Sequence, residues 1–168
     1  GRAVVIALNK WDAVEDRTVA RRAMEDVLMA SLAQLKGVTV VPISAMTGKG
    51  VDKLMPAVRE TMERWNKRVP TARINRWLEG VLEQHPPPAV RGARVKLRYM
   101  TQTKARPPTF VLMASRASDM PEHYKRYLIN SLRESFDLPG TPMRLTVKSG
   151  SANPYAEGGA KSGPERYK

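Results

Sequence analysis

Residues 3–12 have the sequence Ala-Val-Val-Ile-Ala-Leu-Asn-Lys-Trp-Asp, an apolar run that stops at Asn9. The apolar part contains consecutive β-branched side chains, which are typical of a short strand buried on both faces of a parallel sheet. Polar residues follow the run directly, without a turn sequence between them. The stretch therefore predicts a buried strand that ends in a polar loop.

The next sixty residues continue an alternation of strand and helix. Apolar residues recur at helical spacing over residues 16–36, and Gly37 then predicts the end of that helix. A second apolar run covers 38–43, a loop follows at 44–50, and a second amphipathic helix is expected over 51–66. The order β-α-β-α predicts an α/β fold with parallel strands joined by right-handed crossovers.

A second segment has a different order of elements. It predicts a small α+β domain in the order α-β-β-α-β, with a polar loop over 101–108 between its first two strands. The expected elements are a helix over 72–84, strands over 94–100 and 109–114, a helix over 121–136 and a strand over 143–148. We therefore expect one domain over 1–68, a second over 69–149, and a disordered Gly-, Ser- and Pro-rich tail over 150–168.

Composition excludes several kinds of site. The 168 residues contain no cysteine, so disulfides, thiolate metal sites and a cysteine nucleophile are excluded. The two histidines are far apart, and we expect no metal site. No apolar run approaches the roughly 20 residues that a membrane span needs, so no membrane partner is expected. Residues 69–149 hold 14 Lys/Arg against 6 Asp/Glu, an excess that attracts polyanions such as RNA.

The loop Asn9-Lys10-Trp11-Asp12 has the chemistry to recognise guanine. The Asp12 carboxylate can accept hydrogen bonds from guanine N1–H and N2–H together, and such charge-assisted bidentate pairs are strong. Asn9 can contact N7 and brace the neighbouring loop, and the Lys10 stem can lie over the purine face. Adenine lacks this donor pair, so we predict that these four residues bind a guanine nucleotide, GTP.

A second loop, Ser44-Ala45-Met46-Thr47-Gly48-Lys49-Gly50, also follows a predicted strand. A backbone N–H near Ala45 can donate to guanine O6, and the glycines permit the turn into the next helix. The two loops have the order and positions of the fourth and fifth motifs of translation-factor-class GTPases. We therefore add Ser44 and Ala45 to the nucleotide site and interpret residues 1–68 as the C-terminal half of a P-loop GTPase domain.

The catalytic motifs of GTPases do not occur in this sequence. There is no G-x-x-x-x-G-K-[ST] phosphate loop, and no Asp-x-x-Gly motif precedes Asn9. We therefore assign no catalytic residue and no metal ligand here, and we expect the chain alone not to hydrolyse GTP. Mg²⁺ is expected only in an intact protein that carries the missing motifs.

The predicted RNA-binding residues are basic and alternate with apolar positions on strands or lie on the last helix. They are Arg94, Lys96, Arg98, Lys125, Arg126, Arg144 and Lys148. If the two basic strands are neighbours, they form one stripe suited to phosphate contacts; a solvated strand face is the alternative. The α-β-β-α-β order suggests a KH-type fold, although the usual G-x-x-G clamp is absent. The domain could instead dock on folded RNA or on another domain of its own protein.

Both segments together resemble the C-terminal part of one family, the bacterial GTPases Der (EngA). The residues that carry the resemblance are 7–12, 44–50, Gln84-His85-Pro86-Pro87-Pro88, Arg91-Gly92, Lys96-Leu97-Arg98-Tyr99, Arg106-Pro107-Pro108-Thr109-Phe110 and Tyr124-Lys125-Arg126-Tyr127-Leu128. The resemblance implies the end of a second GTPase domain followed by a KH-like domain. It also implies a cytoplasmic protein that binds and hydrolyses GTP and acts in assembly of the large ribosomal subunit. Its implied partners are rRNA and the other GTPase domain.

One alternative function stays open. The chain could be a non-catalytic RNA-binding module whose GTPase segment is vestigial and no longer binds nucleotide. A phosphate loop upstream of Gly1 would support the GTPase interpretation, and its absence would support the alternative.

Overall fold

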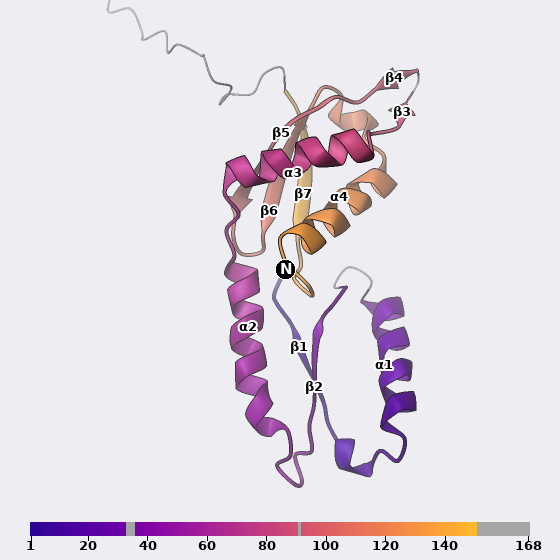
Figure 1. Ribbon diagram of the computed structural model, residues 1–168, viewed down its shortest axis with the longest axis vertical. Helices are drawn as coiled ribbons and strands as arrows, with labels where there is room; N and C mark the ends of the chain where they lie inside the picture. The colour runs from indigo at the N-terminus through magenta and orange to yellow at the C-terminus, as the bar shows by residue number, and fades with distance from the viewer. Residues whose placement is uncertain (33–35, 91, 151–168) are drawn as a thin grey trace, which may run out of the picture.

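The computed structural model describes residues 1–32, 36–90 and 92–150 and contains two parts, one above the other in Figure 1. The lower part holds a two-stranded sheet with helices α1 and α2, and the upper part holds a three-stranded sheet with helices α3 and α4. The tail predicted over 150–168 lies, from residue 151 onward, outside the described residues. None of the described helices is long and apolar enough to cross a membrane.

The lower part has the predicted β-α-β-α order. Strands β1 (Val5–Leu8) and β2 (Thr39–Pro42) pair in parallel, and α1 (Arg17–Ser31) lies between them in sequence. A 3-10 turn, η3 (Val51–Lys53), leads into α2 (Leu54–Asn66). The Asp16 carboxylate starts α1 by accepting the N–H groups of Thr18 and Val19 at 2.9 and 3.0 Å.

Helix α1 differs from the prediction in length and in packing. The helix expected to reach residue 36 ends at Ser31, and residues 33–35, which include the predicted apolar Leu35, are outside the described ranges. None of its residues is buried, and Val19 and Val27 are each 62% exposed. A groove of about 740 Å³ lies between α1 and β2. Two strands offer too little apolar surface to cover this helix. Among the described residues, the small buried core of the lower part is formed by Val41, Ile43 and Ala57, of which Ala57 lies on α2.

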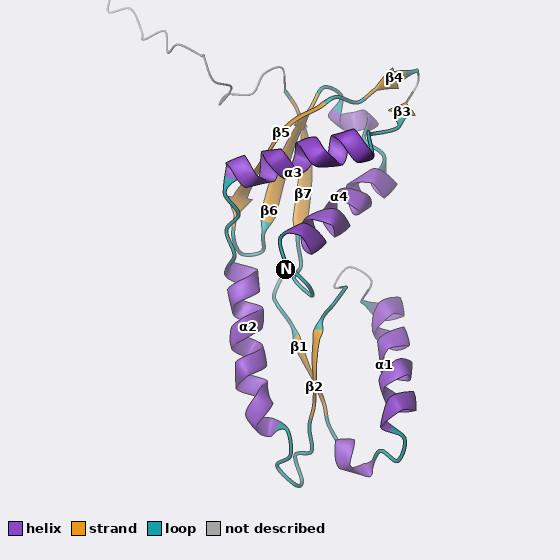
Figure 2. Cartoon of the chain, viewed as in Figure 1, coloured by secondary structure: helices purple, strands orange, loops and turns teal. Residues whose placement is uncertain are grey.

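The upper part contains the predicted α-β-β-α-β order with one addition. Strands β5 (Leu97–Lys104), β6 (Thr109–Ala114) and β7 (Arg144–Ser149) form one sheet in that order, with β5 and β6 antiparallel and β6 and β7 parallel. Helices α3 (Thr71–Gln84) and α4 (Glu122–Ser135) cover one face of it (Figure 2). The addition is a short hairpin of β3 (Ala89–Val90) and β4 (Ala93–Arg94); a 3-10 turn, η4 (Ala117–Asp119), precedes α4.

Two predicted boundaries in this sheet are wrong. The strand expected over 94–100 is divided between β4 and β5, and the loop expected over 101–108 is shorter because β5 continues to Lys104. The polar residues of β5 caused the second error, since Gln102 in a strand resembles a loop residue in sequence. Gln102 is nevertheless buried, because its side chain is fully engaged in hydrogen bonds.

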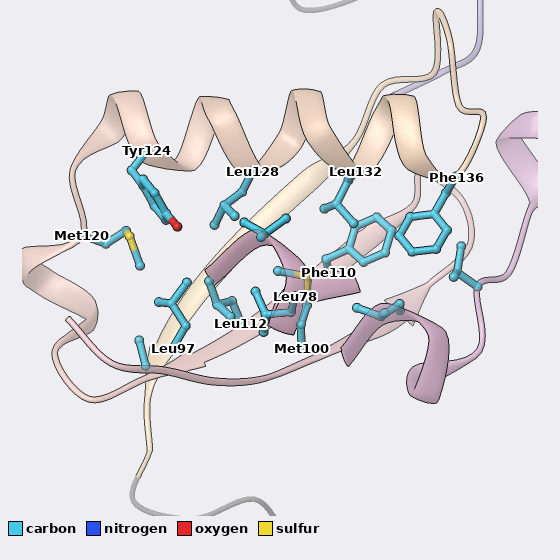
Figure 3. Packing of buried hydrophobic residues seen from close by; sticks show 14 of the residues in the cluster. Leu78, Leu97, Met100, Phe110, Leu112, Met120, Tyr124, Leu128, Leu132 and Phe136 are labelled. Carbon is cyan, nitrogen blue, oxygen red and sulfur yellow. The ribbon is translucent and has the colours of Figure 1, made fainter. Parts of the chain in front are cut away.

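The core of the upper part lies between this sheet and its two helices. Apolar side chains of both helices meet those of β5 and β6 there (Figure 3). Phe110 and Leu112 from the middle strand and Leu128 and Leu132 from α4 are completely buried. Burial of each side chain of this size contributes on the order of 1.5–3 kcal/mol. This core therefore contributes more to the stability of the chain than the small core of the lower part does.

Two side-chain amides close the outer edge of β5. Asn75 donates to the Met100 carbonyl at 3.0 Å and accepts the Met100 N–H at 2.9 Å, as a neighbouring strand would. Gln102 accepts the Val69 N–H at 2.8 Å and donates to the Lys67 carbonyl at 2.9 Å. The edge is thereby satisfied without another strand, and the connection between the two parts is tied to the upper sheet.

Candidate guanine-binding site and basic surface

The two predicted nucleotide loops begin where β1 and β2 end side by side. Beyond the strands, the Ile43 N–H donates to the Leu8 carbonyl at 2.9 Å, and the Trp11 N–H donates to the Ile43 carbonyl at 3.0 Å. These two bonds extend the pairing of the strands into the loops. Loop 9–12 and loop 44–50 therefore start from one rigid edge.

Asn9 joins the two loops directly. Its side-chain Oδ1 accepts the Lys10 N–H at 2.8 Å and the Ala45 N–H at 3.0 Å. This is the bracing contact that we expected of Asn9. The Ala45 N–H, expected to donate to guanine O6, donates in this structure to a side chain of the same site.

The backbone of loop 9–12 turns sharply at Lys10. Lys10 has φ 62° and ψ 30°, the left-handed conformation, and the 3-10 turn η1 (Trp11–Ala13) begins immediately after it. This turn brings Asp12 back toward the second loop. The side chains of Lys10 and Asp12 are exposed, and Trp11 is half-buried.

Asp12 and Ser44 interact across the two loops. Ser44 is only 2% exposed, and its hydroxyl oxygen accepts the Thr47 N–H at 3.1 Å. A hydrogen bond from the Ser44 side chain, and a weaker one from the backbone N–H of Asp12 itself, lower the pKa of the Asp12 carboxyl. A carboxyl with a lowered pKa is ionised at neutral pH, the form that accepts two hydrogen bonds from a base.

Gly50 allows loop 44–50 to close. It has φ 80°, and a Cβ at this position would lie 2.5 Å from the Pro42 carbonyl oxygen. The loop is closed at its other end by the Ser44 N–H, which donates to the Lys49 carbonyl at 2.9 Å. Only glycine fits this close approach without a shift of the strand, so Gly50 shapes the site although it offers no side chain to a ligand.

The described residues provide no site for the magnesium ion that GTP hydrolysis would use. No group of three or more His, Asp or Glu side chains among them could hold a metal ion. The residues present do not fit the ion, and we derive no step through it.

The predicted RNA-binding residues fall into separate groups. Arg94, Lys96 and Arg98 are exposed near β4 and the start of β5, and Arg144 and Lys148 are exposed on β7. The expected single stripe is not formed, because β6 lies between β5 and β7. Arg144 and Lys148 face away from the helices, since their neighbours in sequence, Leu145 and Val147, pack against the core.

The two basic residues predicted on α4 lie on the side of the sheet that the helices cover. Lys125 Nζ is 2.6 Å from Glu122 Oε1, an ion pair that lowers the pKa of the Glu122 carboxyl. Much of the positive charge of Lys125 is therefore neutralised within the helix. Arg126 is exposed beside it.

The expectation that Gly50 permits the turn into the next helix is confirmed by its positive φ directly before η3. Sequence reasoning missed two residues that shape the structure around these sites, Asn75 and Gln102. Their contacts at the edge of β5 depend on segments distant in sequence.

The fold and the joined loops together define a class of protein. The parallel β-α-β-α part with its Asn-Lys-X-Asp and Ser-Ala loops is the C-terminal part of a P-loop GTPase domain, and a small KH-like α+β domain follows it.

Comparison with known proteins identifies the family. Residues 68–148 match the family described as the KH-domain-like domain of EngA bacterial GTPase enzymes, C-terminal. The whole chain is 53% identical over 169 residues to "GTPase Der" of Ruegeria sp. (strain TM1040), covering 34% of that protein. Over 93% of its length, the chain is 54% identical to "GTPase Der" of Rhodopseudomonas palustris (strain TIE-1) and covers 34% of that protein. Over 93% of its length, it is also 53% identical to "GTPase Der" of Brucella suis (strain ATCC 23445 / NCTC 10510) and covers 32% of that protein. The chain is therefore homologous to the C-terminal part of the Der (EngA) GTPases, and it spans about a third of the length of these relatives.

We predict that Asn9→Ala separates the two loops. Loss of Oδ1 removes the acceptor of the Lys10 and Ala45 N–H groups, and a hydrogen bond worth about 1 kcal/mol corresponds to roughly fivefold faster exchange of the amide hydrogen. Hydrogen–deuterium exchange followed by NMR at Ala45 measures this. Asn130→Ala, an exposed asparagine on α4, is the control and should leave Ala45 unchanged. Equal protection of Ala45 in wild type and Asn9→Ala would show that the side chain does not hold the loops together.

Proposed function

We propose that this chain supplies the guanine-recognising loops and an RNA-contacting domain to a protein that binds and hydrolyses GTP and acts in assembly of the large ribosomal subunit. The observation that carries the proposal is the hydrogen bond from the Ala45 N–H to Asn9 Oδ1. It brings Asp12, Ser44 and Ala45, which come from two loops, to one place. Relatives about 53% identical to the chain carry the name GTPase Der, which supports the same function.

Guanine selectivity follows from the ionised Asp12. Its carboxylate oxygens accept N1–H and N2–H of guanine, and hydrogen bonds to a charged group contribute about 1.5–3 kcal/mol each. Adenine offers no donor at N1 or C2, so it would leave the carboxylate without these bonds. Asn9 and the Lys10 stem then contact N7 and the ring face, while Trp11, Ser44 and Ala45 complete the site.

The chemistry of hydrolysis is assigned to other parts of the intact protein. The phosphate loop, the switch motif and the ligands of Mg²⁺ are not in this sequence. We therefore propose that the chain selects the nucleotide and that a preceding segment of the same domain holds the phosphates. The proposed location of the intact protein is the cytoplasm, and its other GTPase domain is a proposed partner.

RNA contact is supported by charge. The excess of Lys and Arg over residues 69–149 attracts the phosphates of rRNA, and Arg94, Lys96, Arg144 and Lys148 hold part of that charge on exposed positions. Contacts of this kind give affinity that falls steeply with salt and little sequence specificity. The domain therefore positions the protein on folded rRNA rather than identifying a short sequence.

We predict that Asp12→Asn changes the nucleotide preference of the full-length protein from guanine to xanthine. The asparagine amide donates where the carboxylate accepted, which suits the 2-oxo group of xanthine and opposes the 2-amino group of guanine. Affinity for GDP should fall by roughly a hundredfold or more, as two charge-assisted hydrogen bonds are lost, and affinity for XDP should rise. Isothermal titration calorimetry measures both affinities. Each affinity is compared with that of wild type, so that the contribution of any other nucleotide site in the protein cancels.

The control for this titration is Asp26→Asn on the exposed side of α1, which should bind GDP like wild type. Unchanged GDP affinity in Asp12→Asn would contradict the proposed guanine site. It would instead support the alternative in which the GTPase segment is vestigial and the chain only binds RNA.

We predict that the basic residues on β7 contribute to binding of ribosomal particles. In Arg144→Gln with Lys148→Gln, the slope of log affinity against log salt should decrease by about 2, since each lost phosphate contact changes it by about 1. Co-sedimentation with 50S particles over a salt series measures the slope. Arg94→Gln with Lys96→Gln tests the other basic group in the same way, and Arg17→Gln with Arg22→Gln on α1 is the control. An unchanged slope in both test pairs would contradict RNA contact by this domain.

A further inference from the structure

Besides a contact of Gly1 with Pro107, hydrogen bonds among the described residues attach the KH-like domain to the GTPase segment at two points of different character. The first is the connection after α2, where Gln102 is hydrogen-bonded to Lys67 and Val69. The second is a contact between loop 36–38 and loop 137–141, which are about a hundred residues apart in sequence. We call this second contact the glycine joint.

Two glycines permit the backbones to approach closely in the glycine joint. The Gly140 N–H donates to the Lys36 carbonyl at 2.8 Å. A Cβ on Gly140 would lie 2.7 Å from Val38 Cα, and a Cβ on Gly37 would lie 2.9 Å from Pro139 Cβ. Both glycines also have positive φ, 61° for Gly140 and 83° for Gly37. Alanine at either position cannot be accommodated unless the two loops move apart.

The interactions around the glycine joint are weak. Lys36 Nζ lies 3.6 Å from Glu134 Oε1 and Lys67 Nζ lies 3.8 Å from Asp137 Oδ2, with at least 40% of each of these side chains exposed. Exposed ion pairs contribute little and are screened by salt. A cavity of about 260 Å³ beside the joint shows that the contact is not closely packed.

The connection after α2 is held more firmly. Gln102 is 8% exposed, and besides the Lys67 and Val69 backbone it also donates to the Lys104 carbonyl at 3.2 Å. Hydrogen bonds of a buried amide are costly to break, because the amide would be left unsatisfied. The two attachments therefore differ in strength, and the glycine joint is the weaker.

We propose that the glycine joint is a releasable brace. When it is closed, the KH-like domain has one orientation on the GTPase segment; when it opens, the connection at Lys67–Val69 becomes a hinge about which the domain rotates. The joint adjoins the start of β2, which leads to Ser44 and Ala45, and it lies three residues before β7, which carries Arg144 and Lys148. Its state therefore sets the position of the basic β7 relative to the guanine loops, whether or not those loops bind nucleotide.

The test measures an interdomain distance in the full-length protein. Spin labels are attached at Glu63→Cys on α2 and Ser118→Cys in η4; the chain itself has no cysteine to compete, and any elsewhere in the protein is replaced. Pulsed electron paramagnetic resonance should give one narrow distance distribution for wild type at low salt. Gly140→Ala should broaden the distribution or add a second maximum, and high salt should shift wild type in the same direction.

The matched control is Gly92→Ala. Gly92 also has positive φ, at 72°, but no atom lies within 4 Å of the position of its Cβ, so alanine there adds backbone strain without separating loops. If Gly140→Ala disturbs the fold of the KH-like domain, Gly37→Ala opens the joint from the other side and should broaden the distribution in the same way. A narrow, wild-type distribution in folded Gly37→Ala and Gly140→Ala would overturn the proposal, as would equal broadening in Gly92→Ala.

Discussion

The hydrogen bond from the Ala45 N–H to Asn9 Oδ1 links two loops that are 36 residues apart in sequence. The proposed nucleotide site depends on it, because Asp12, Lys10 and Trp11 lie on one loop and Ser44 and Ala45 on the other. The parallel pairing of β1 and β2 places the loops near each other, and Asn9 then sets their separation. The Ser44 hydroxyl completes the link by its hydrogen bond to the Asp12 carboxylate, which lowers the pKa of that carboxyl. The two loops of the proposed guanine site are thus joined at the ends of two strands, although the sheet that carries them is small.

The larger hydrophobic core and the proposed guanine loops are located in different parts of the chain. The lower part has a core of few residues and an α1 helix with no buried side chain, whereas the upper part has a continuous core around Phe110 and Leu128. The Gln102 contacts and the glycine joint connect the two. The loops that we propose to select guanine are therefore supported from outside their own small core, by the parallel strands and by the attached KH-like domain.

The sequence predicted those features that depend on local pattern or local chemistry. The apolar run before Asn9 and the helical spacing after it were sufficient for the β-α-β-α order, and the motif chemistry of the two loops predicted the contact of Asn9 with its neighbour. Features that depend on distant segments could not be predicted. Gln102 resembles a loop residue until Lys67 and Val69 are placed beside it. Whether the two basic strands are neighbours stayed open, because nothing local shows that β6 lies between them. The sequence predicted that the apolar face of α1 would be packed, but none of its residues is buried. An apolar stripe indicates which face of a helix is apolar, and it does not indicate whether another surface is present to cover that face.

We propose that Asp12 accepts hydrogen bonds from both donors of guanine, N1–H and N2–H, once Asn9 has joined the loops. The most direct measurement compares the affinities of GDP, IDP and ADP for the full-length protein. Binding is monitored by the fluorescence of Trp11, after the two other tryptophans of this chain, Trp65 and Trp77, are replaced by phenylalanine. Hypoxanthine keeps N1–H and lacks the 2-amino group, so IDP should bind roughly ten- to a hundredfold more weakly than GDP, as expected for one hydrogen bond to a charged acceptor, and ADP more weakly still. Equal affinity for GDP and IDP would contradict the bidentate contact, and equal affinity for all three would contradict the guanine site itself.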